Sequence, residues 1–328
     1  MLAQFTNKLK PSSLHRLPHI LLSMSCLILS ALSSPSYAQS CPPAGYSEAS
    51  LQELKQKQWE LKGDIKGEIK HDLKVDAKRQ QLAFALLSCL ASPNPHLRDE
   101  IAFEALSFWM RNKLLDTATV RKISQKLLTQ IADTQASPNA DFSKPFAALT
   151  LAEVVRVDRL QAFMTEQERS DMVNAAAQFL SGVKDYRGFD EKEGWRHGVA
   201  HGADWMLQLA LNPQLKAEQH QVILQALATQ INNEQHFYIF GEPERMMAPV
   251  FFLALRSPLD DAAWQAWFEK LIQGSTNAAP MNTQASLARR HNLKAFLQAL
   301  YVNVHESKQE RIKEKLQPLI VSSLKKLN

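Results

Sequence analysis

The stretch from residue 185 to residue 211 reads DYRGFDEKEGWRHGVAHGADWMLQLAL and holds the densest group of polar and titratable residues in the chain. Its acidic cluster precedes an apolar-periodic run, as is typical of a helix N-terminus. Asn212-Pro213 closes the run, because proline disfavours helical geometry in the residue before it. The stretch therefore predicts a loop followed by one helix that begins near Glu191 and ends at Asn212.

Polar side chains of this predicted helix fall on one narrow stripe at 100° per residue. The stripe contains no lysine, and small or apolar residues border it, whereas a solvent-facing stripe usually carries mixed charges. Glycines at four-residue spacing on its flank would let another backbone approach closely. We therefore expect the stripe to face a cleft or the protein interior. Its members are Glu193, His197, His201, Asp204 and Gln208.

Composition places the chain among ordinary globular proteins. It has 328 residues, of which 45% are hydrophobic and 22% charged. This length can bury a sizeable core as one large domain or two. The chain has only 10 glycines and abundant Leu, Ala, Gln and Lys, a balance that favours helix.

The first 38 residues have the pattern of a secretory signal peptide. Lys8, Lys10 and Arg16 form a basic region without an acid, an apolar core follows, and Ser36-Tyr37-Ala38 supplies small residues for a signal peptidase. The alternative is an uncleaved membrane anchor, but the apolar run is short and rich in serine. We expect cleavage after Ala38, a periplasmic or secreted location, and no stable membrane insertion of the mature chain.

The charge balance gives no indication of nucleic-acid binding. The chain has 38 Lys and Arg against 33 Asp and Glu. The predicted signal peptide holds three of the basic residues and no acidic one, so the mature chain would carry a net charge of about +2. Basic residues are also not interleaved with aromatic ones, as they are in many nucleic-acid-binding surfaces.

Two cysteines remain after the predicted cleavage, Cys41 and Cys89. An even pair in an oxidising compartment favours a disulfide that ties the mature N-terminus to the helix around Cys89. The alternative is a buried free Cys89 and an unpaired Cys41.

The rest of the chain predicts helix after helix, and no alternating segment is long enough to indicate a strand. The order predicts an all-α fold of stacked helical hairpins, either a HEAT-like α-solenoid or a compact α/α array. We assign residues 39–70 to an N-terminal extension and 71–328 to one all-helical domain. The predicted helices cover about 47–62, 75–91, 96–115, 117–132, 146–160, 166–183, 217–233, 244 onward, 259–273, 283–304 and 307–327.

Several runs resemble the bacterial family catalogued as domain of unknown function 2785, over roughly residues 75 to 305. The central signature combines Arg187-Gly188-Phe189, Gly194-Trp195, His197, Ala200-His201 and Ala203-Asp204, and further runs are HLRDEIA at 96–102, the segment 146–158, GEPER at 241–245 and RHNLKAFL at 290–297. Lys144-Pro145 departs from the arginine-serine pair that the family pattern leads us to expect. The resemblance implies an all-helical fold and no established activity.

The two histidines of the stripe have the i, i+4 spacing by which a helix presents two imidazoles to one metal. A metalloprotease helix would carry Glu after the first histidine, and that position is Gly198, so this class is excluded. Asp204 could be a third ligand of a divalent metal or could orient His201, and Glu244 or Glu242 could supply a ligand from another helix. The alternative is a buried hydrogen-bond network in which Arg187 or Arg245 satisfies the histidines and Asp204.

Two functional hypotheses follow. The first is an exported helical-repeat protein that binds a polar ligand, such as a peptide or glycan, or a protein partner, in a polar cleft around the GWRHGVAHGAD helix. The second is a hydrolase or lyase that uses His197 or His201 as acid, base or metal ligand. The candidate cleft residues are Arg187, Glu193, Trp195, His197, His201, Asp204, Glu244 and Arg245.

Overall fold

The computed structural model describes residues 40–62, 73–133, 140–276 and 281–327. The chain divides into Met1–Ala38 and a compact unit, Gln39–Asn328. The predicted signal peptide lies outside the described residues, as do residues 63–70 of the predicted N-terminal extension. The fold is all-α, as predicted, and the strands among the described residues are confined to one short hairpin.

The first part of the unit contains helices of three kinds. The segment predicted as one helix over 75–91 is an α-helix that continues as a 3-10 helix, and the segment predicted over 96–115 begins as a π-helix. The hydrogen-bond pattern thus differs from the prediction, while both segments stay helical. The elements are α1 (Glu48–Gln56), α2 (Leu73–Ala85), η1 (Leu86–Ala91), η2 (His96–Phe103), α3 (Glu104–Arg111) and α4 (Thr117–Ala132).

The second part is more regular, and its helix boundaries lie close to the predicted ones except in the central stretch and in α5, which begins before 146. The elements are α5 (Ala140–Leu160), α6 (Glu166–Gly182), β1 (Phe189–Asp190), β2 (Gly194–Trp195), α7 (Gly198–Ala210), α8 (Ala217–Ile231), α9 (Glu242–Arg256), α10 (Asp261–Ile272), α11 (Gln284–His305) and α12 (Glu310–Leu327).

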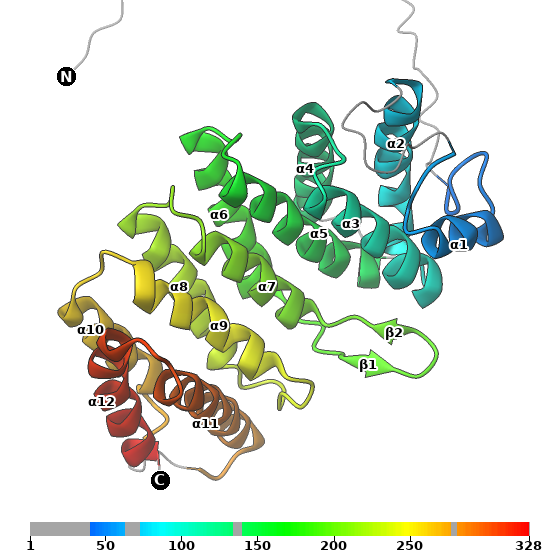
Figure 1. The fold of residues 1–328 in the computed structure, drawn as a ribbon. Helices are drawn as coiled ribbons and strands as arrows, with labels where there is room; N and C mark the ends of the chain where they lie inside the picture. Colours follow the sequence, from blue (N-terminus) through cyan, green and yellow to red (C-terminus); the bar gives the residue numbers. More distant parts are fainter. Residues whose placement is uncertain (1–39, 63–72, 134–139, 277–280, 328) are drawn as a thin grey trace, which may run out of the picture. The chain divides into compact units, whose positions relative to one another are not determined.

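The helices pack as two rows (Figure 1). One row contains α3, α5, α7, α9 and α11, each packed against the next. The other row contains α2, α4, α6 and α8, and α12 closes the series against α10 and α11. The pairs α4–α5, α6–α7 and α8–α9 are helical hairpins that follow one another in the sequence. This succession is the stacked arrangement that the sequence predicts.

Short polar side chains fix where many of the helices begin. Ser47, Asp116, Thr165, Asp260 and Thr283 each accept a hydrogen bond from a backbone N–H in the first turn of the helix that follows. Such N-caps satisfy donors that the helix itself leaves unpaired. They explain why the starts of these five helices could be predicted from the sequence. The end of α1 was predicted wrongly, because the helix stops at Gln56 and not near 62.

A buried carboxylate holds the connection between α5 and α6. Asp158 accepts hydrogen bonds from the backbone N–H groups of Phe163 and Met164, from the Arg169 guanidinium and from the Asn212 amide. Burial raises the pKa of Asp158, but these hydrogen bonds outweigh burial, and the pKa lies below its usual value. The ionised carboxylate is therefore the form that the fold requires.

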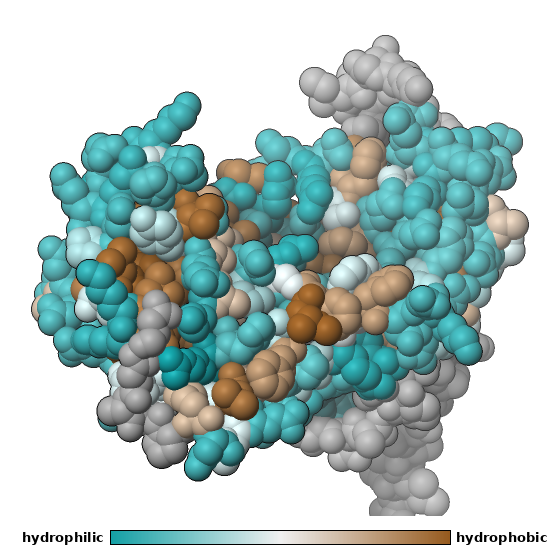
Figure 2. All heavy atoms as spheres, turned by 90° about the horizontal axis from the view of Figure 1, so that it is seen from below, coloured by the Kyte–Doolittle hydropathy of each residue, from teal (hydrophilic) through white to brown (hydrophobic). Residues whose placement is uncertain are grey.

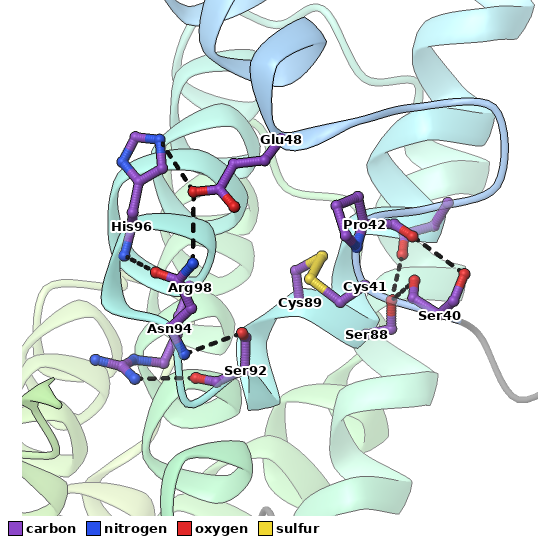
Figure 3. The surroundings of a disulfide bond; sticks show 11 residues. Ser40, Cys41, Pro42, Glu48, Ser88, Cys89, Ser92, Asn94, His96 and Arg98 are labelled. Atoms are coloured by element: carbon purple, nitrogen blue, oxygen red, sulfur yellow. Dashed lines mark hydrogen bonds and ion pairs between the residues drawn. A yellow bond between two sulfur atoms is a disulfide. The ribbon is translucent and has the colours of Figure 1, made fainter.

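The predicted disulfide is confirmed (Figure 3). Cys41 and Cys89 are joined, with their Cα atoms 5.0 Å apart. Beside the bond, the Ser88 hydroxyl donates to the Ser40 carbonyl at 2.9 Å. The segment that follows Cys41 belongs to the core, because Trp59 is buried and packs edge-to-face on Trp109.

No helix in the described part of the chain combines the length and the apolar character that a membrane crossing requires.

Candidate functional site

The central stretch forms a hairpin and then a helix that begins later than predicted. β1 and β2 pair antiparallel, with Asp190 opposite Gly194. The Asp190 carboxylate accepts hydrogen bonds from the backbone N–H groups of Lys192 and Glu193, and Gly194 has a φ of 72°, which favours glycine. The acidic cluster therefore makes a turn, and the prediction that Glu193 and His197 lie on the helix with His201 is wrong.

Arg98, on the π-helix η2, holds this hairpin in place. Its fully buried guanidinium donates to the carbonyl of Glu193 at 2.7 Å and to that of Trp195 at 3.3 Å. It also donates to the carbonyl of Ser92 at 2.9 Å (Figure 3) and pairs with the Asp99 carboxylate. One cation thus fixes the second strand of the hairpin to a segment about a hundred residues earlier in the chain.

A second loop, residues 232–241 between α8 and α9, is held in the same manner. The fully buried Asn292 of α11 donates to the carbonyls of Asn233 and His236 and accepts from the N–H of Tyr238. The Tyr238 hydroxyl donates to the Gln230 side chain at 2.7 Å. Buried polar side chains therefore determine the path of this loop as well.

The two loops meet at Phe240. A Cβ built on Gly188 would lie 2.1 Å from the Phe240 ring, so only glycine fits at this position. The Phe240 ring also packs edge-to-face on Trp195, with centroids 6.0 Å apart.

His197 lies beneath this junction and faces a buried carboxylate. It precedes α7 with a φ of 49°, an uncommon backbone conformation for a residue with a side chain. Its Nε2 is 3.6 Å from Oε1 of Glu242 and has no hydrogen-bond partner among the described residues. Burial lowers the pKa of His197 to about 4, and burial raises the pKa of Glu242. The His197 imidazole is therefore neutral at physiological pH.

His201 lies one turn into α7 and is also buried. Its Nδ1 is 3.2 Å from the carbonyl oxygen of Pro145, and its ring packs edge-to-face on Phe146. Burial lowers the pKa of His201 to about 3, so the imidazole is neutral at physiological pH. The ring centroids of His197 and His201 are 6.0 Å apart.

Asp204 faces Arg245 of α9. Arg245 Nη1 donates to both carboxylate oxygens of Asp204, at 2.8 and 2.9 Å. Burial raises the pKa of Asp204, and the neighbouring guanidinium opposes that rise. The pair thus links α7 to α9, as one of the two sequence alternatives expected.

The structure does not bring the three predicted metal ligands together. Asp204 pairs with Arg245, and His197 faces Glu242. Within the described ranges, no group of three or more His, Cys, Asp or Glu side chains is arranged to hold a metal ion.

The remaining candidate residues lie at the surface. Arg187 pairs with Asp185, two residues earlier, and Glu193 pairs with the buried Arg196. Glu244 is exposed on the first turn of α9. Trp195 stacks on His197 with centroids 4.7 Å apart and so covers the imidazole from the solvent side.

Large apolar side chains are exposed on both loops. Phe189 is 49% exposed, Trp195 39% and Ile239 70%. Phe189 packs on Trp195 at 5.2 Å, and Phe240 joins the two loops. We call these four residues the rim patch. Figure 2 shows that apolar side chains gather in patches on the face of the molecule seen from below, within a mostly hydrophilic surface.

Two pockets formed by described residues lie elsewhere. One, of about 640 Å³, is lined by α8 and α10, and the other, of about 600 Å³, mainly by α4, α5 and α6. None of the eight candidate residues lines either pocket. From the central stretch, Asp185 and Gly198 line the second pocket.

Sequence reasoning missed the side chains that position the site. Arg98 and Asn292 stood within runs that carried the family resemblance, HLRDEIA and RHNLKAFL, but no role followed from those runs. Their partners in the two loops are backbone groups more than 50 residues away, and such contacts leave no local pattern.

Stacked helical hairpins and two loops held by buried polar side chains define an all-α protein. The chain belongs to the family described as protein of unknown function (DUF2785), whose model matches residues 127–302. No curated protein and no solved structure matches the chain.

Proposed function

We propose that the protein is an exported binding protein that engages a protein partner through the rim patch. The observation that carries the proposal is the exposure of Phe189, Trp195 and Ile239 on two loops whose backbones are held by buried polar side chains. The solvent-exposed part of an apolar side chain does not stabilise the folded state, because only buried apolar surface does so. Rigid scaffolds that present exposed loop residues are typical of binding sites.

Preorganisation favours binding by this surface. Arg98 and Asn292 fix the loops before any partner arrives, so little conformational entropy remains to be lost on association. Large aromatic side chains are also enriched among the residues that dominate protein interfaces. By contrast, the polar groups beneath the patch are already paired with one another or buried, which favours a structural role for them.

Charges around the rim patch indicate the kind of partner. Asp190, Glu191 and Glu244 are exposed beside it, and so are Lys192, Arg187 and Arg245. Both arginines are already paired with carboxylates, Arg187 with Asp185 and Arg245 with Asp204. The acidic excess favours a partner segment whose apolar side chains are flanked by Lys or Arg. We therefore propose that the rim patch binds a peptide segment of another protein that combines apolar side chains with Lys or Arg.

Export is the second part of the proposal. It rests on the basic region, apolar core and small residues before Gln39, and the Cys41–Cys89 disulfide supports it because such bonds persist in oxidising compartments. Sequencing the N-terminus of protein recovered outside the cytoplasm is the test. We expect it to begin at Gln39, and a retained Met1 in a membrane fraction would contradict cleavage.

The binding proposal is tested by selecting peptides from a random displayed library against the native protein. Selected peptides should combine apolar side chains with Lys or Arg. Ile239→Asp should weaken their binding at least tenfold, while Val302→Asp, an equally simple change at an exposed apolar position on α11, should leave it unchanged. Failure to select any peptide, or equal loss in both variants, would refute the role of the rim patch.

One observation favours a hydrolase or lyase as the second candidate. The Nε2 atom of His197 is buried without a hydrogen-bond partner among the described residues and faces Glu242. An acid–base role requires that solvent and substrate reach this nitrogen. Diethyl pyrocarbonate labelling, read by mass spectrometry, should therefore modify His197 almost as fast as the half-buried His96 if the protein is an enzyme of this kind. Protection of His197 until the protein unfolds would exclude this candidate.

A further inference from the structure

The groove of about 640 Å³ between α8 and α10 is lined by equal numbers of apolar and polar side chains, and its apolar members include Leu224, Trp267 and Leu271. Small side chains create it, because Ala228 of α8 and Ala263 and Ala266 of α10 line the same space. The Trp267 indole N–H donates to the carbonyl of Leu224 at 3.1 Å and so joins the two helices across the groove. The width of the groove is therefore fixed by a hydrogen bond.

The chemistry of the groove differs between its ends. Arg289 of α11 donates to the Asn232 side chain and to the carbonyl of Gln273, which follow the last turns of α8 and α10. Lys270, in the last turn of α10, lines the groove at the same end and has no ion-pair partner among the described residues. At the other end lie Gln221 and Leu259.

The charge of the lining is positive. It contains two cations, Lys270 and Arg289, and no carboxylate. Glu234, outside the lining, offsets Arg289 through an ion pair at 2.9 Å. Lys270 is thus the positive charge available to attract an anion, and Trp267 and Leu271 of the same helix also line the groove.

We propose that this groove binds a free aliphatic carboxylate, with the hydrocarbon chain against Trp267 and the alanines and the carboxylate at Lys270. The volume lies within the range of small-molecule pockets, roughly 300–1,000 Å³. A docked helix fits poorly, because a cylinder about 10 Å wide would fill this volume in little more than one turn. The positive end discriminates against neutral and cationic amphiphiles. The proposal is independent of binding at the rim patch.

The test is isothermal titration of the full-length mature protein with decanoate and with decyltrimethylammonium, which has the same chain and the opposite charge. We expect saturable one-to-one binding of decanoate and at least tenfold weaker binding of the cation. Lys270→Glu should weaken decanoate binding at least tenfold, whereas Lys126→Glu, at an exposed lysine on α4, should not.

A second variant addresses the hydrocarbon chain. Ala263→Leu fills the groove, and we expect it to abolish decanoate binding while thermal unfolding stays unchanged or moves to higher temperature, since added apolar contacts stabilise a helix pair. The absence of a decanoate isotherm in the native protein overturns the proposal. Equal affinity of native protein, Lys270→Glu and Ala263→Leu also overturns it. Ile239→Asp should bind decanoate normally, which separates this site from the rim patch.

Discussion

Replacing Arg98 by Ala should destabilise the protein and release the hairpin. The guanidinium is fully buried and donates to the carbonyls of Ser92, Glu193 and Trp195. It also lies over the rings of Phe142 and Phe146, at 4.0 and 4.8 Å from their centroids. Alanine removes all of these contacts and leaves a cavity.

The magnitude follows from the contacts that are lost. A hydrogen bond that involves a charged group contributes about 1.5–3 kcal/mol, and the bond to Trp195, at 3.3 Å, is the longest of the three. Removing one partner of a buried ion pair typically costs about 3–5 kcal/mol. The Asp99 side chain is 27% exposed, so water can solvate the carboxylate left behind, and this lowers the cost. We therefore expect Arg98→Ala to reduce the free energy of unfolding by about 3 kcal/mol.

Urea denaturation followed by circular dichroism measures the change, with Arg311→Ala on α12 as the control. Arg311 is exposed, so its replacement should change the free energy of unfolding by less than about 0.5 kcal/mol. Hydrogen exchange reports the local effect, because the His197 N–H donates to the Arg187 carbonyl within the clamped segment. A loss below about 1 kcal/mol, with unchanged exchange at His197, would refute the clamp.

Three further predictions concern other parts of the fold. Reduction of the Cys41–Cys89 disulfide should cost about 4 kcal/mol, from the loop of 48 residues that it closes, and melting with and without reductant measures it. The Asp158 pKa is depressed by folding, so its contribution to stability is present above the unfolded pKa of about 3.9 and is lost as the pH falls through the folded value. Asp158→Asn should therefore remove part of the acid dependence of unfolding, and an unchanged pH profile would contradict this. Gly188→Ala should destabilise by over about 1 kcal/mol, because its Cβ would overlap the neighbouring aromatic ring, whereas Gly182→Ala meets no atom within 4 Å and should not.

The sequence predicted the helices well because their limits are local. α4 spans Thr117–Ala132, as predicted, and its N-cap Asp116 is the immediate neighbour of its first residue. Hydrophobic periodicity and caps act over a few residues, so one sequence is enough to find them.

The start of α7 was predicted wrongly because one local pattern fits two structures. Acidic residues favour the first turn of a helix, but an aspartate can also accept backbone hydrogen bonds in a turn, as Asp190 does. Gly194 and the distant Arg98 decide between the two by stabilising the hairpin. The pair of Asp204 and Arg245 was one of the alternatives predicted from the sequence. The position of His197 opposite Glu242 depends on how α7 and α9 are aligned side by side, which a local sequence pattern does not determine.

Because Arg98 contacts the hairpin from far earlier in the chain, it limits how short a folded fragment of this protein can be. The family model covers residues 127–302, which include the hairpin and both histidines but not the arginine that holds them. The same limits omit α12, which packs on α11 and has Ile312, Leu316 and Ile320 buried. A fragment limited to residues 127–302 would leave the carbonyls of Glu193 and Trp195 without Arg98 and would expose the face of α11 that packs on α12. We therefore expect that the smallest part able to fold by itself extends beyond residues 127–302.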